Sequence, residues 1–504
     1  MTIYHINKAI GRASSGVEYA QKYRYDLVKD FPEQQFFVFC DHIGQNLLTY
    51  TDKIGIAPEF VLSVHKFMSG QKNHRSSVTV EQFRSTLSGA FDEKWLSDFS
   101  LVLSQGKLTY KIWLIEELGV IDRVDFAIGG RLFEVHYFSD RLTHIDFYDG
   151  SVVSVRHFFD ENGEVSMRQL FDKGELALTF VDGQVLRGRN AFYQEFFRRL
   201  SWSEDDLIIV DRTHDLLDAI FPQKATAKLA IVIHAEHYSQ AVQEESWVLW
   251  NNYYEYSFTN CAEIDAFIVS TARQKEILQH QFTEQGKSPR LWTIPVGFLS
   301  KISTGDKLEE NKYKMLTVSR LAVEKHVDLL VKAVIKAKES LPELEFHIYG
   351  EGNQRKILLE LIKEHQAESY ISMHGHQAME GEYEKYGVYL TASRSEGFGL
   401  TLLEALGACL PIIGLRVDYG NIEFISDCEN GILLETAAEN AKIISFAQAI
   451  VKLTEDFDTQ KIIKFSQKKA QEYTEASVRE KWRSFYDQMR EVRKTDEAFT
   501  DRLL

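Results

Sequence analysis

The sequence predicts an α/β protein with two doubly wound lobes and an antiparallel β-sheet domain inserted in the first lobe. Short apolar strands alternate with helices from the start of the chain, and this alternation stops at about His65. It resumes after Asn190 and continues from Tyr313 towards the end. Alternating strands and helices favour parallel sheets joined by helical crossovers, so each alternating region predicts one sheet of this kind.

The first strand and helix form a βα unit with a glycine-containing turn. Residues 2–6 form an apolar strand, Gly11-Arg12-Ala13-Ser14-Ser15-Gly16 is the turn, and a helix follows at about residues 17–28. Ligands of open α/β sheets bind beyond the carboxyl ends of the strands, so this turn is placed to contact a phosphate or a sugar. A turn whose glycines serve only packing is the equal alternative.

Residues 65–189 contain short aromatic and β-branched runs in place of the alternation, such as 132–138, 143–148 and 152–159. The turn signals between runs are Asp149-Gly150, Glu161-Asn162-Gly163, Lys173-Gly174 and Asp182-Gly183. Pairs of this kind between β-type runs indicate hairpins, so we expect an antiparallel meander. Its aromatic surface is either a docking face or part of an ordinary two-layer core.

The alternation returns with apolar strands at 207–210, 230–233, 266–269 and 291–294. His234-Ala235-Glu236-His237 follows the second of these strands. A histidine at the carboxyl end of a strand faces the ligand side of the sheet, so we predict that His234 contacts the substrate, with His237 as the second candidate. Zinc binding by the pair is a third reading, although no nearby Cys, Asp or Glu completes a convincing site.

The second lobe starts after Pro295-Val296-Gly297, which we interpret as a connector. Its first strand ends just before Arg320, and Lys325 follows after a tight turn. Two cations at one strand end can point into the same cleft, where a diphosphate is the natural ligand. A solvated surface charge pair is the alternative reading.

The stretch from residue 389 to 405 reads as a strand, a glycine loop and a helix that ends before Pro411. The first N–H groups of such a helix have no intrahelical acceptor and bind an anion such as a diphosphate. Glu396 lies in the loop and Glu404 about one turn into the helix, with seven residues between them. One carboxylate can contact a sugar and the other a ribose, whereas a solvated helix face is the alternative.

Composition excludes several other classes of protein. A net charge of −16 argues against wrapping a nucleic acid, which requires clustered Lys and Arg. The four cysteines are widely spaced, which indicates free thiols in a reducing compartment. The start of the chain lacks a secretory signal, and no apolar run is long enough to span a bilayer. We therefore expect a cytoplasmic protein, with peripheral contact to the inner face of the cell membrane left open.

Four segments together resemble one family closely. They are Ala-Ser-Ser-Gly-Val-Glu-Tyr-Ala-Gln (13–21), Val-Ile-His-Ala-Glu-His-Tyr-Ser (232–239), Ser-Arg-Leu-Ala-Val-Glu-Lys-His (319–326) and Thr-Ala-Ser-Arg-Ser-Glu-Gly-Phe-Gly-Leu-Thr-Leu (391–402). Together with the β-type insertion, they resemble the glycosyltransferase A subunit of the accessory-Sec pathway of Gram-positive bacteria, a group of retaining family 4 glycosyltransferases.

The resemblance implies the GT-B fold, in which two Rossmann-like lobes face a cleft. The implied domains are an N-terminal acceptor-side lobe (1–64 and 190–296), an inserted extended β-sheet domain for partner and acceptor binding (65–189), a C-terminal nucleotide-sugar lobe (297–475) and a helix that crosses back to the N-terminal lobe (476–504).

The resemblance also implies an activity. Members of the family transfer N-acetylglucosamine from UDP-GlcNAc to Ser and Thr of serine-rich-repeat adhesins, with UDP-glucose as the other candidate donor, and they work with a homologous non-catalytic B subunit. Two other functions stay open. One is transfer to wall teichoic acid or another polymer, and the other is a non-catalytic acceptor-binding subunit.

Carried onto matching positions, the resemblance implies specific contacts. The residues expected to contact UDP are Gly16, Val17, Glu18, Tyr19, Arg320, Lys325, Gly375, His376 and Glu404. Those expected at the sugar are His234, Glu396, Gly397, Phe398 and Gly399. Arg12 departs from the family, where we expect Trp, which leaves the preference for sugar or acceptor near this turn open.

The expected reaction retains the configuration of the sugar. No carboxylate stands out as a dedicated nucleophile, so a front-face route is favoured. Arg320, Lys325 and the helix start near Gly397 would stabilise the charge of the leaving phosphate, and Glu396 and His234 complete the predicted catalytic set. We therefore expect no cofactor and no metal ion.

Overall fold

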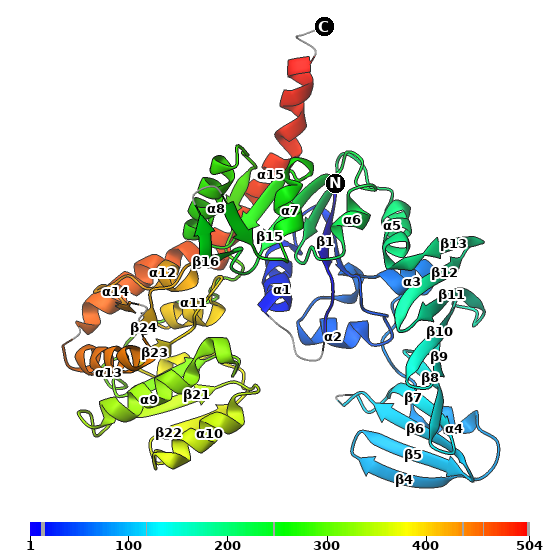
Figure 1. Ribbon diagram of the computed structural model, residues 1–504, viewed down its shortest axis with the longest axis horizontal. Coiled ribbons are helices and arrows are strands. Elements are labelled where there is room, and N and C mark those ends of the chain that lie inside the picture. Colours follow the sequence, from blue (N-terminus) through cyan, green and yellow to red (C-terminus); the bar gives the residue numbers. More distant parts are fainter. Residues whose placement is uncertain (12–15, 117, 245–246, 436–437, 457, 501–504) are drawn as a thin grey trace. The chain divides into compact units, whose positions relative to one another are not determined.

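The computed structural model describes all residues except 12–15, 117, 245–246, 436–437, 457 and 501–504 (Figure 1). The chain forms two compact units. The first unit comprises Met1–Tyr25, Phe31–Val232 and Tyr253–Asp265, and the second comprises Asp26–Asp30, Ile233–Asn252 and Ala266–Leu504. The boundaries of these units differ from those of the predicted domains, which stay predictions.

Parallel strands form the α/β part of the first unit, in the order β15-β14-β1-β2-β3. Their bounds are β1 Thr2–Asn7, β2 Gln34–Phe39, β3 Val61–Ser63, β14 Leu207–Val210 and β15 Lys228–Ile233. The accompanying helices are α1 Gly16–Val28, α2 Leu47–Lys53, α3 Val64–Ser69, α5 Gly188–Leu200, α6 Leu217–Ile220 and α7 Glu255–Thr259, with 3-10 turns at Pro58–Phe60 and Cys261–Glu263. Every residue of β14 and β15 is buried, as is typical of parallel strands covered on both faces.

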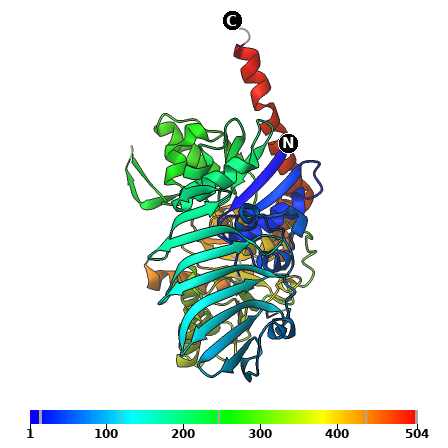
Figure 2. The same cartoon turned by 90° about the vertical axis from the view of Figure 1, so that its right-hand side faces the viewer.

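The predicted meander is confirmed as a ten-stranded antiparallel sheet in which each strand pairs with the next, from β4 to β13 (Figure 2). Its strands are β4 Asp92–Ser97, β5 Ser100–Gln105, β6 Leu108–Leu114, β7 Ile121–Ile128, β8 Arg131–Phe138, β9 Leu142–Asp149, β10 Val152–Phe159, β11 Val165–Asp172, β12 Glu175–Val181 and β13 Gln184–Arg187. Asp182 and Gly183 join the last two strands with φ of 47° and 74°, the positive angles that a type I′ turn requires. Helix α4 (Val80–Ser85) belongs to the same sequence region.

The second unit contains a six-stranded parallel sheet in the order β22-β21-β20-β23-β24-β25. The strands are β20 Lys314–Val318, β21 Glu345–Tyr349, β22 Ile371–Gly375, β23 Val388–Thr391, β24 Ile412–Leu415 and β25 Gly431–Leu434. The helices are α9 Val327–Lys338, α10 Arg355–Glu364, α11 Leu400–Gly407, α12 Gly420–Phe424, α13 Glu439–Asp456 and α14 Thr459–Ala470, with 3-10 turns at Val323–Lys325, Tyr383–Lys385 and Gln471–Tyr473. This alternation confirms the predicted doubly wound lobe.

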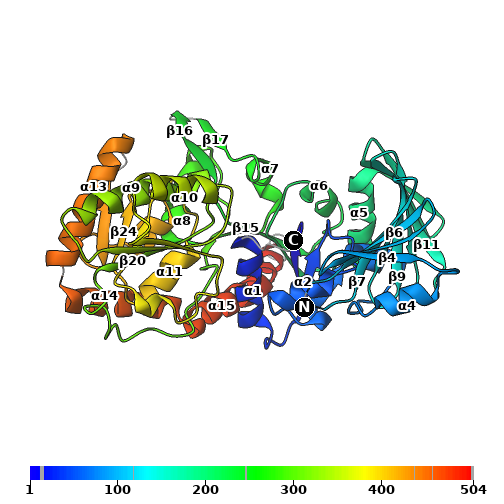
Figure 3. The same cartoon turned by 90° about the horizontal axis from the view of Figure 1, so that it is seen from below.

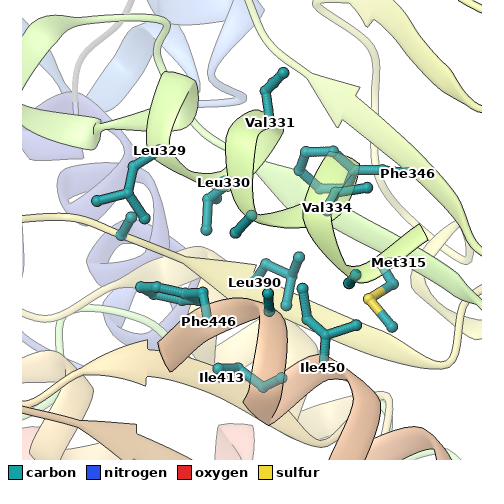
Figure 4. Packing of buried hydrophobic residues seen from close by; sticks show 14 of the residues in the cluster. Met315, Leu329, Leu330, Val331, Val334, Phe346, Leu390, Ile413, Phe446 and Ile450 are labelled. Carbon is teal, nitrogen blue, oxygen red and sulfur yellow. The ribbon is translucent and has the colours of Figure 1, made fainter. Parts of the chain in front are cut away.

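Helices cover both faces of this sheet, so that β20 and β24 lie between two helical layers (Figure 3). On one side, Leu330 and Val334 of α9 pack with Ile450 of α13 against Leu390 and Ile413 of the sheet (Figure 4). On the other side, a second core contains residues of α11 and α14, such as Leu402, Leu406 and Ile462. Burial on both faces explains why the central strands β23 and β24 are short, largely apolar runs.

The second unit also contains β16 (Tyr238–Glu244), β17 (Trp247–Trp250), β18 (Ala266–Val269), α8 (Ala272–Glu284), β19 (Leu291–Thr293) and α15 (Glu475–Thr500). Phe485 of α15 packs against Trp292 of β19, with ring centroids 5.3 Å apart. Residue 292 precedes the predicted connector, so the last helix contacts a strand that was assigned to the N-terminal lobe. Within the described part of the chain, no helix is both long enough and apolar enough to cross a membrane.

A buried network of polar side chains attaches α1 to the sheet of the first unit. Arg24 of α1 donates two hydrogen bonds to Asp211, which follows β14, and both side chains are almost completely buried. Gln21 donates to the same carboxylate at 3.0 Å and accepts from Asn7 at 3.0 Å. A buried ion pair of this kind is expensive to break, because the remaining charge cannot reach water.

The Arg24–Asp211 pair generates a stability prediction. Asp211→Asn removes one charge of the pair, and we expect it to lower the free energy of unfolding of the first unit by about 3–5 kcal/mol. Urea unfolding followed by tryptophan fluorescence measures the change, and buried Trp202 is one of the tryptophans of this unit. The control Asp52→Asn removes the exposed partner of Arg75 and should leave the transition in place. Equal transitions for wild type and Asp211→Asn would contradict the role given to the pair.

Candidate active site

The predicted anion site is the loop between β23 and α11. Gly399 is the N-cap of α11 and has φ of 86°, a left-handed conformation that favours glycine. A Cβ at this position would lie 2.6 Å from Cδ1 of Leu402. Phe398 is buried and stacks edge-on against Phe424 at 5.0 Å, so it supports the loop from the core side. The start of α11 therefore offers backbone N–H groups to a negatively charged ligand.

Gly397 brings this loop into direct contact with the segment after β15. A Cβ on Gly397 would lie 2.4 Å from the carbonyl oxygen of His234 and 3.2 Å from Cα of Ala235. Gln274 of α8 fixes the same segment, because its Nε2 donates to the carbonyl of Ala235 at 2.9 Å. The second unit therefore brings together His234 and the loop of residues 396–399, both predicted at the sugar.

The two histidines of this segment have different surroundings. His234 is half-buried at the end of β15. His237 is fully buried, its Nε2 lies 2.8 Å from Oε1 of Gln281 and its Nδ1 lies 3.1 Å from the hydroxyl of Tyr419. Burial lowers the pKa of His237 to about 4, so its ring is neutral near pH 7.

These contacts occupy both ring nitrogens of His237, so we assign it to positioning the segment and not to binding a substrate. The zinc reading also lacks support in the described part of the chain, where no three His, Cys, Asp or Glu side chains gather as metal ligands.

Lys325 and Glu396 form an ion pair that the sequence did not predict. Lys325 Nζ lies 2.6 Å from Glu396 Oε2, and both side chains are largely buried. The carbonyl of Glu396 accepts hydrogen bonds from the backbone N–H groups of Tyr419 and Gly420 at 3.2 and 2.8 Å. The adjacent cation and carboxylate can serve two parts of one ligand, because an ammonium binds phosphate oxygens and a carboxylate accepts from hydroxyl groups.

Arg320 is more exposed than Lys325. Its guanidinium donates to Glu324 at 3.1 Å, and 71% of its side chain is accessible to solvent. The backbone N–H of Arg394 donates to the carbonyl of Glu324 at 3.1 Å, which joins the turn after β20 to the glycine loop. Arg320 is thus on the turn adjoining that loop, with a side chain that remains largely solvated.

Glu404 lies on α11 and accepts a hydrogen bond at 2.6 Å from the hydroxyl of Tyr383. Burial raises the pKa of Glu404, and the bond from Tyr383 opposes that rise. Gly375 ends β22 with φ of 73°, and a Cβ there would lie 2.9 Å from Oε1 of Glu351. His376 follows and is exposed.

Helix α1 of the first unit carries the remaining predicted UDP contacts, which are Gly16, Val17, Glu18 and Tyr19. Glu18 is buried and pairs with Arg212 at 3.2 Å, so the fold of its own unit holds it. Tyr19 is 40% exposed and presents its ring to solvent. Arg12, the departure from the family pattern, lies outside the described residues.

The sequence did not single out Tyr383 or Tyr419, although both contact predicted site residues. The signal for Tyr383 is a repeat of tyrosines at three-residue intervals, Tyr383, Tyr386 and Tyr389, just before the glycine loop. No local pattern marks Tyr419, because its partner His237 lies 182 residues away in the chain.

Comparison with known proteins identifies close relatives. A family model described as "Glycosyl transferases group 1" matches residues 301–469. The UDP-N-acetylglucosamine–peptide N-acetylglucosaminyltransferase GtfA subunit of Streptococcus pneumoniae is 36% identical over 97% of this chain and 99% of its own length.

Two solved structures are similar over nearly the whole chain. The pneumococcal O-GlcNAc transferase GtfA in complex with UDP and GlcNAc has a TM-score of 0.91 and 36% identity, covering 97% of this chain and 99% of that one. A GtfA/B complex has a TM-score of 0.90 and 34% identity, covering 97% of this chain and 100% of that one. These similarities confirm the GT-B fold predicted from the sequence.

The contacts of His237 with Gln281 and Tyr419 generate a testable prediction. Tyr419→Phe removes the hydroxyl next to a buried ring nitrogen, and we expect the free energy of unfolding of the second unit to fall by about 1–3 kcal/mol. Tyr313→Phe is the matched control, because the Tyr313 hydroxyl makes no hydrogen bond to any described residue. Urea unfolding of both variants measures the difference, and a Tyr419→Phe protein as stable as the control would show that the contact between Tyr419 and His237 contributes nothing.

Proposed function

The chain belongs to the family of UDP-N-acetylglucosamine–peptide N-acetylglucosaminyltransferase GtfA subunits, and on this basis we propose that it is a retaining, UDP-sugar-dependent glycosyltransferase. It transfers N-acetylglucosamine, with glucose as the other candidate sugar, to Ser and Thr hydroxyls of a serine-rich-repeat adhesin as the first step of its O-glycosylation. The observation that carries this proposal is the 36% identity to the pneumococcal GtfA subunit over 97% of the chain.

The geometry of the second unit supports a division of labour among the site residues. Lys325, with Arg320 on the same turn, faces the diphosphate, and the start of α11 adds its N–H groups. Glu396 and His234 contact the sugar, with Gly397, Phe398 and Gly399 forming the wall beside it. Glu404 binds the ribose, and the segment of Gly375 and His376 lines the uridine. Gly16, Val17, Glu18 and Tyr19 of the first unit stay predicted UDP contacts.

In the transfer, the acceptor oxygen bonds to the anomeric carbon as the bond from that carbon to the β-phosphate oxygen breaks. Both events take place on one face of the sugar, so the configuration is retained. The proton of the acceptor hydroxyl leaves with the departing phosphate, whose added negative charge the nearby cations stabilise. Since protein cations and helix N–H groups supply this stabilisation, the reaction requires neither a metal ion nor a cofactor.

The partner of the chain is a homologous non-catalytic B subunit, which the solved GtfA/B complex of a 34% identical relative supports. The predicted cytoplasmic location and the peripheral contact with the cell membrane stay predictions.

Mass spectrometry tests the function directly. A Ser/Thr-rich peptide is incubated with the chain, its B-type partner, EDTA and an equimolar mixture of UDP-GlcNAc and UDP-glucose. We expect mass steps of N-acetylglucosamine, whereas steps of glucose would identify the other donor. Loss of transfer in EDTA that Mg²⁺ restores would overturn the metal-independent mechanism.

The same assay separates the two other functions. UDP release without a change in peptide mass would favour a polymer acceptor such as wall teichoic acid, which is then supplied in competition with the peptide. An absence of UDP release with every acceptor would favour a non-catalytic acceptor-binding subunit.

The role of Lys325 generates a kinetic prediction. Lys325→Ala should cost about 2 kcal/mol or more of transition-state stabilisation, which is about a thirtyfold fall in kcat/KM. Lys336→Ala is the matched control, because Lys336 is exposed on α9 and forms no ion pair with any described residue. Both are assayed at subsaturating donor. Full transfer by Lys325→Ala under this condition would rule out the phosphate contact.

A further inference from the structure

A short turn in the second unit carries two buried tyrosines between the predicted uridine segment and the glycine loop. The 3-10 turn Tyr383–Lys385 lies between β22 and β23, and Tyr386 follows it directly. The backbone N–H of Tyr386 donates to the carbonyl of Tyr383 at 3.1 Å, which closes the turn. Both side chains are 5% exposed and belong to the same apolar core as Leu402 and Leu406 of α11.

The hydroxyl of Tyr383 fixes the ribose-side carboxylate. It donates to Glu404 Oε2 at 2.6 Å, the short distance of a charge-assisted bond. The other carboxylate oxygen, Oε1, accepts no hydrogen bond from any residue in the described part of the chain. A glutamate has three rotatable side-chain bonds, so a bond to one oxygen from a buried phenol orients the second oxygen for an external donor such as a hydroxyl group.

Tyr386 connects the same turn to the base side of the site. Its hydroxyl lies 2.6 Å from the hydroxyl of Tyr349, and the ring of Tyr349 stacks on His374 with centroids 4.6 Å apart and an angle of 16°. His374 also lies 2.9 Å from His347, from Nε2 to Nδ1, which joins β22 to β21. His374 immediately precedes Gly375 and His376, so this stack supports the segment predicted at the uridine.

We propose that this turn is the nucleoside-selecting element of the donor site, in which Tyr383 orients Glu404 for the ribose hydroxyls and Tyr386 holds the base-side segment through Tyr349 and His374. The inference rests on the proposed function and adds two positioning residues to it. Neither tyrosine needs to contact the substrate. The roles of Tyr383 and Tyr386 can be tested separately, because only Tyr383 acts through the carboxylate that binds the ribose hydroxyls.

The test measures the dissociation constants of UDP and of 2′,3′-dideoxy-UDP, which lacks both ribose hydroxyls. Each nucleotide is titrated calorimetrically into the complex of the full chain and its partner. Wild type should bind UDP more tightly than the dideoxy nucleotide. Tyr383→Phe should lower the affinity for UDP by about tenfold and change the affinity for the dideoxy nucleotide little, so the ratio of the two affinities falls. Tyr386→Phe should lower both affinities by one common factor and leave their ratio unchanged.

Kinetics supply a second readout. Both variants should raise KM for UDP-GlcNAc and keep kcat, because the turn supports the nucleoside and not the bond that breaks. Tyr370→Phe is the matched control, since Tyr370 is partly buried and its hydroxyl has no hydrogen bond to the described residues. It should leave KM, kcat and both affinities unchanged.

The outcomes distinguish this inference from the function on which it rests. A wild-type chain that binds no UDP would refute the proposed donor site. If Tyr383→Phe binds UDP with an unchanged preference over the dideoxy nucleotide, the role of Tyr383 is refuted while the proposed function stands. An equal loss of affinity for both nucleotides in this variant would also refute that role, because it indicates a general loss of order in the site. A fall in kcat with constant KM in either variant would place that residue at the chemical step and overturn its positioning role.

Discussion

The candidate site of the second unit depends on one close approach between two backbone segments. Gly397 meets the carbonyl of His234 so closely that a Cβ would lie 2.4 Å from that oxygen. Two main chains reach this distance only where one residue has no side chain. The glycine loop and the end of β15 therefore occupy fixed positions relative to each other, and the predicted sugar contacts His234 and Glu396 are fixed with them.

Buried hydrogen bonds fix the same two segments. The ring nitrogens of His237 contact Gln281 and Tyr419, and the backbone N–H of Tyr419 donates to the carbonyl of Glu396. Each of these groups is costly to leave unpaired away from water, so the arrangement has few alternatives of similar energy. His237, the alternative to His234 in the sequence analysis, has both ring nitrogens engaged by these contacts. The carboxylate of the Lys325–Glu396 ion pair lies on the same loop, whose backbone these hydrogen bonds fix.

Local patterns were enough to predict most of the fold. The strands at 207–210 and 266–269 were predicted with the bounds that the structure shows, because a buried parallel strand is a short apolar run. The turn at Asp182-Gly183 was readable because positive φ angles favour those residues. Pairings between distant residues were not predictable in this way. Lys325 and Glu396 lie 71 positions apart, and Arg24 and Asp211 lie 187 apart, so no local periodicity connects them.

The sequence by itself determined the alternation of strands and helices, the inserted antiparallel sheet, and the glycine loop with the helix that follows it, since each depends on the preferences of neighbouring residues. Only the tertiary structure decided which polar groups share a site. It paired Lys325 with Glu396, gave Glu404 a tyrosine partner and engaged both ring nitrogens of His237 with Gln281 and Tyr419. The physical reason is that burial and hydrogen bonding depend on what lies nearby in space, and the packing of distant segments alone creates those neighbours.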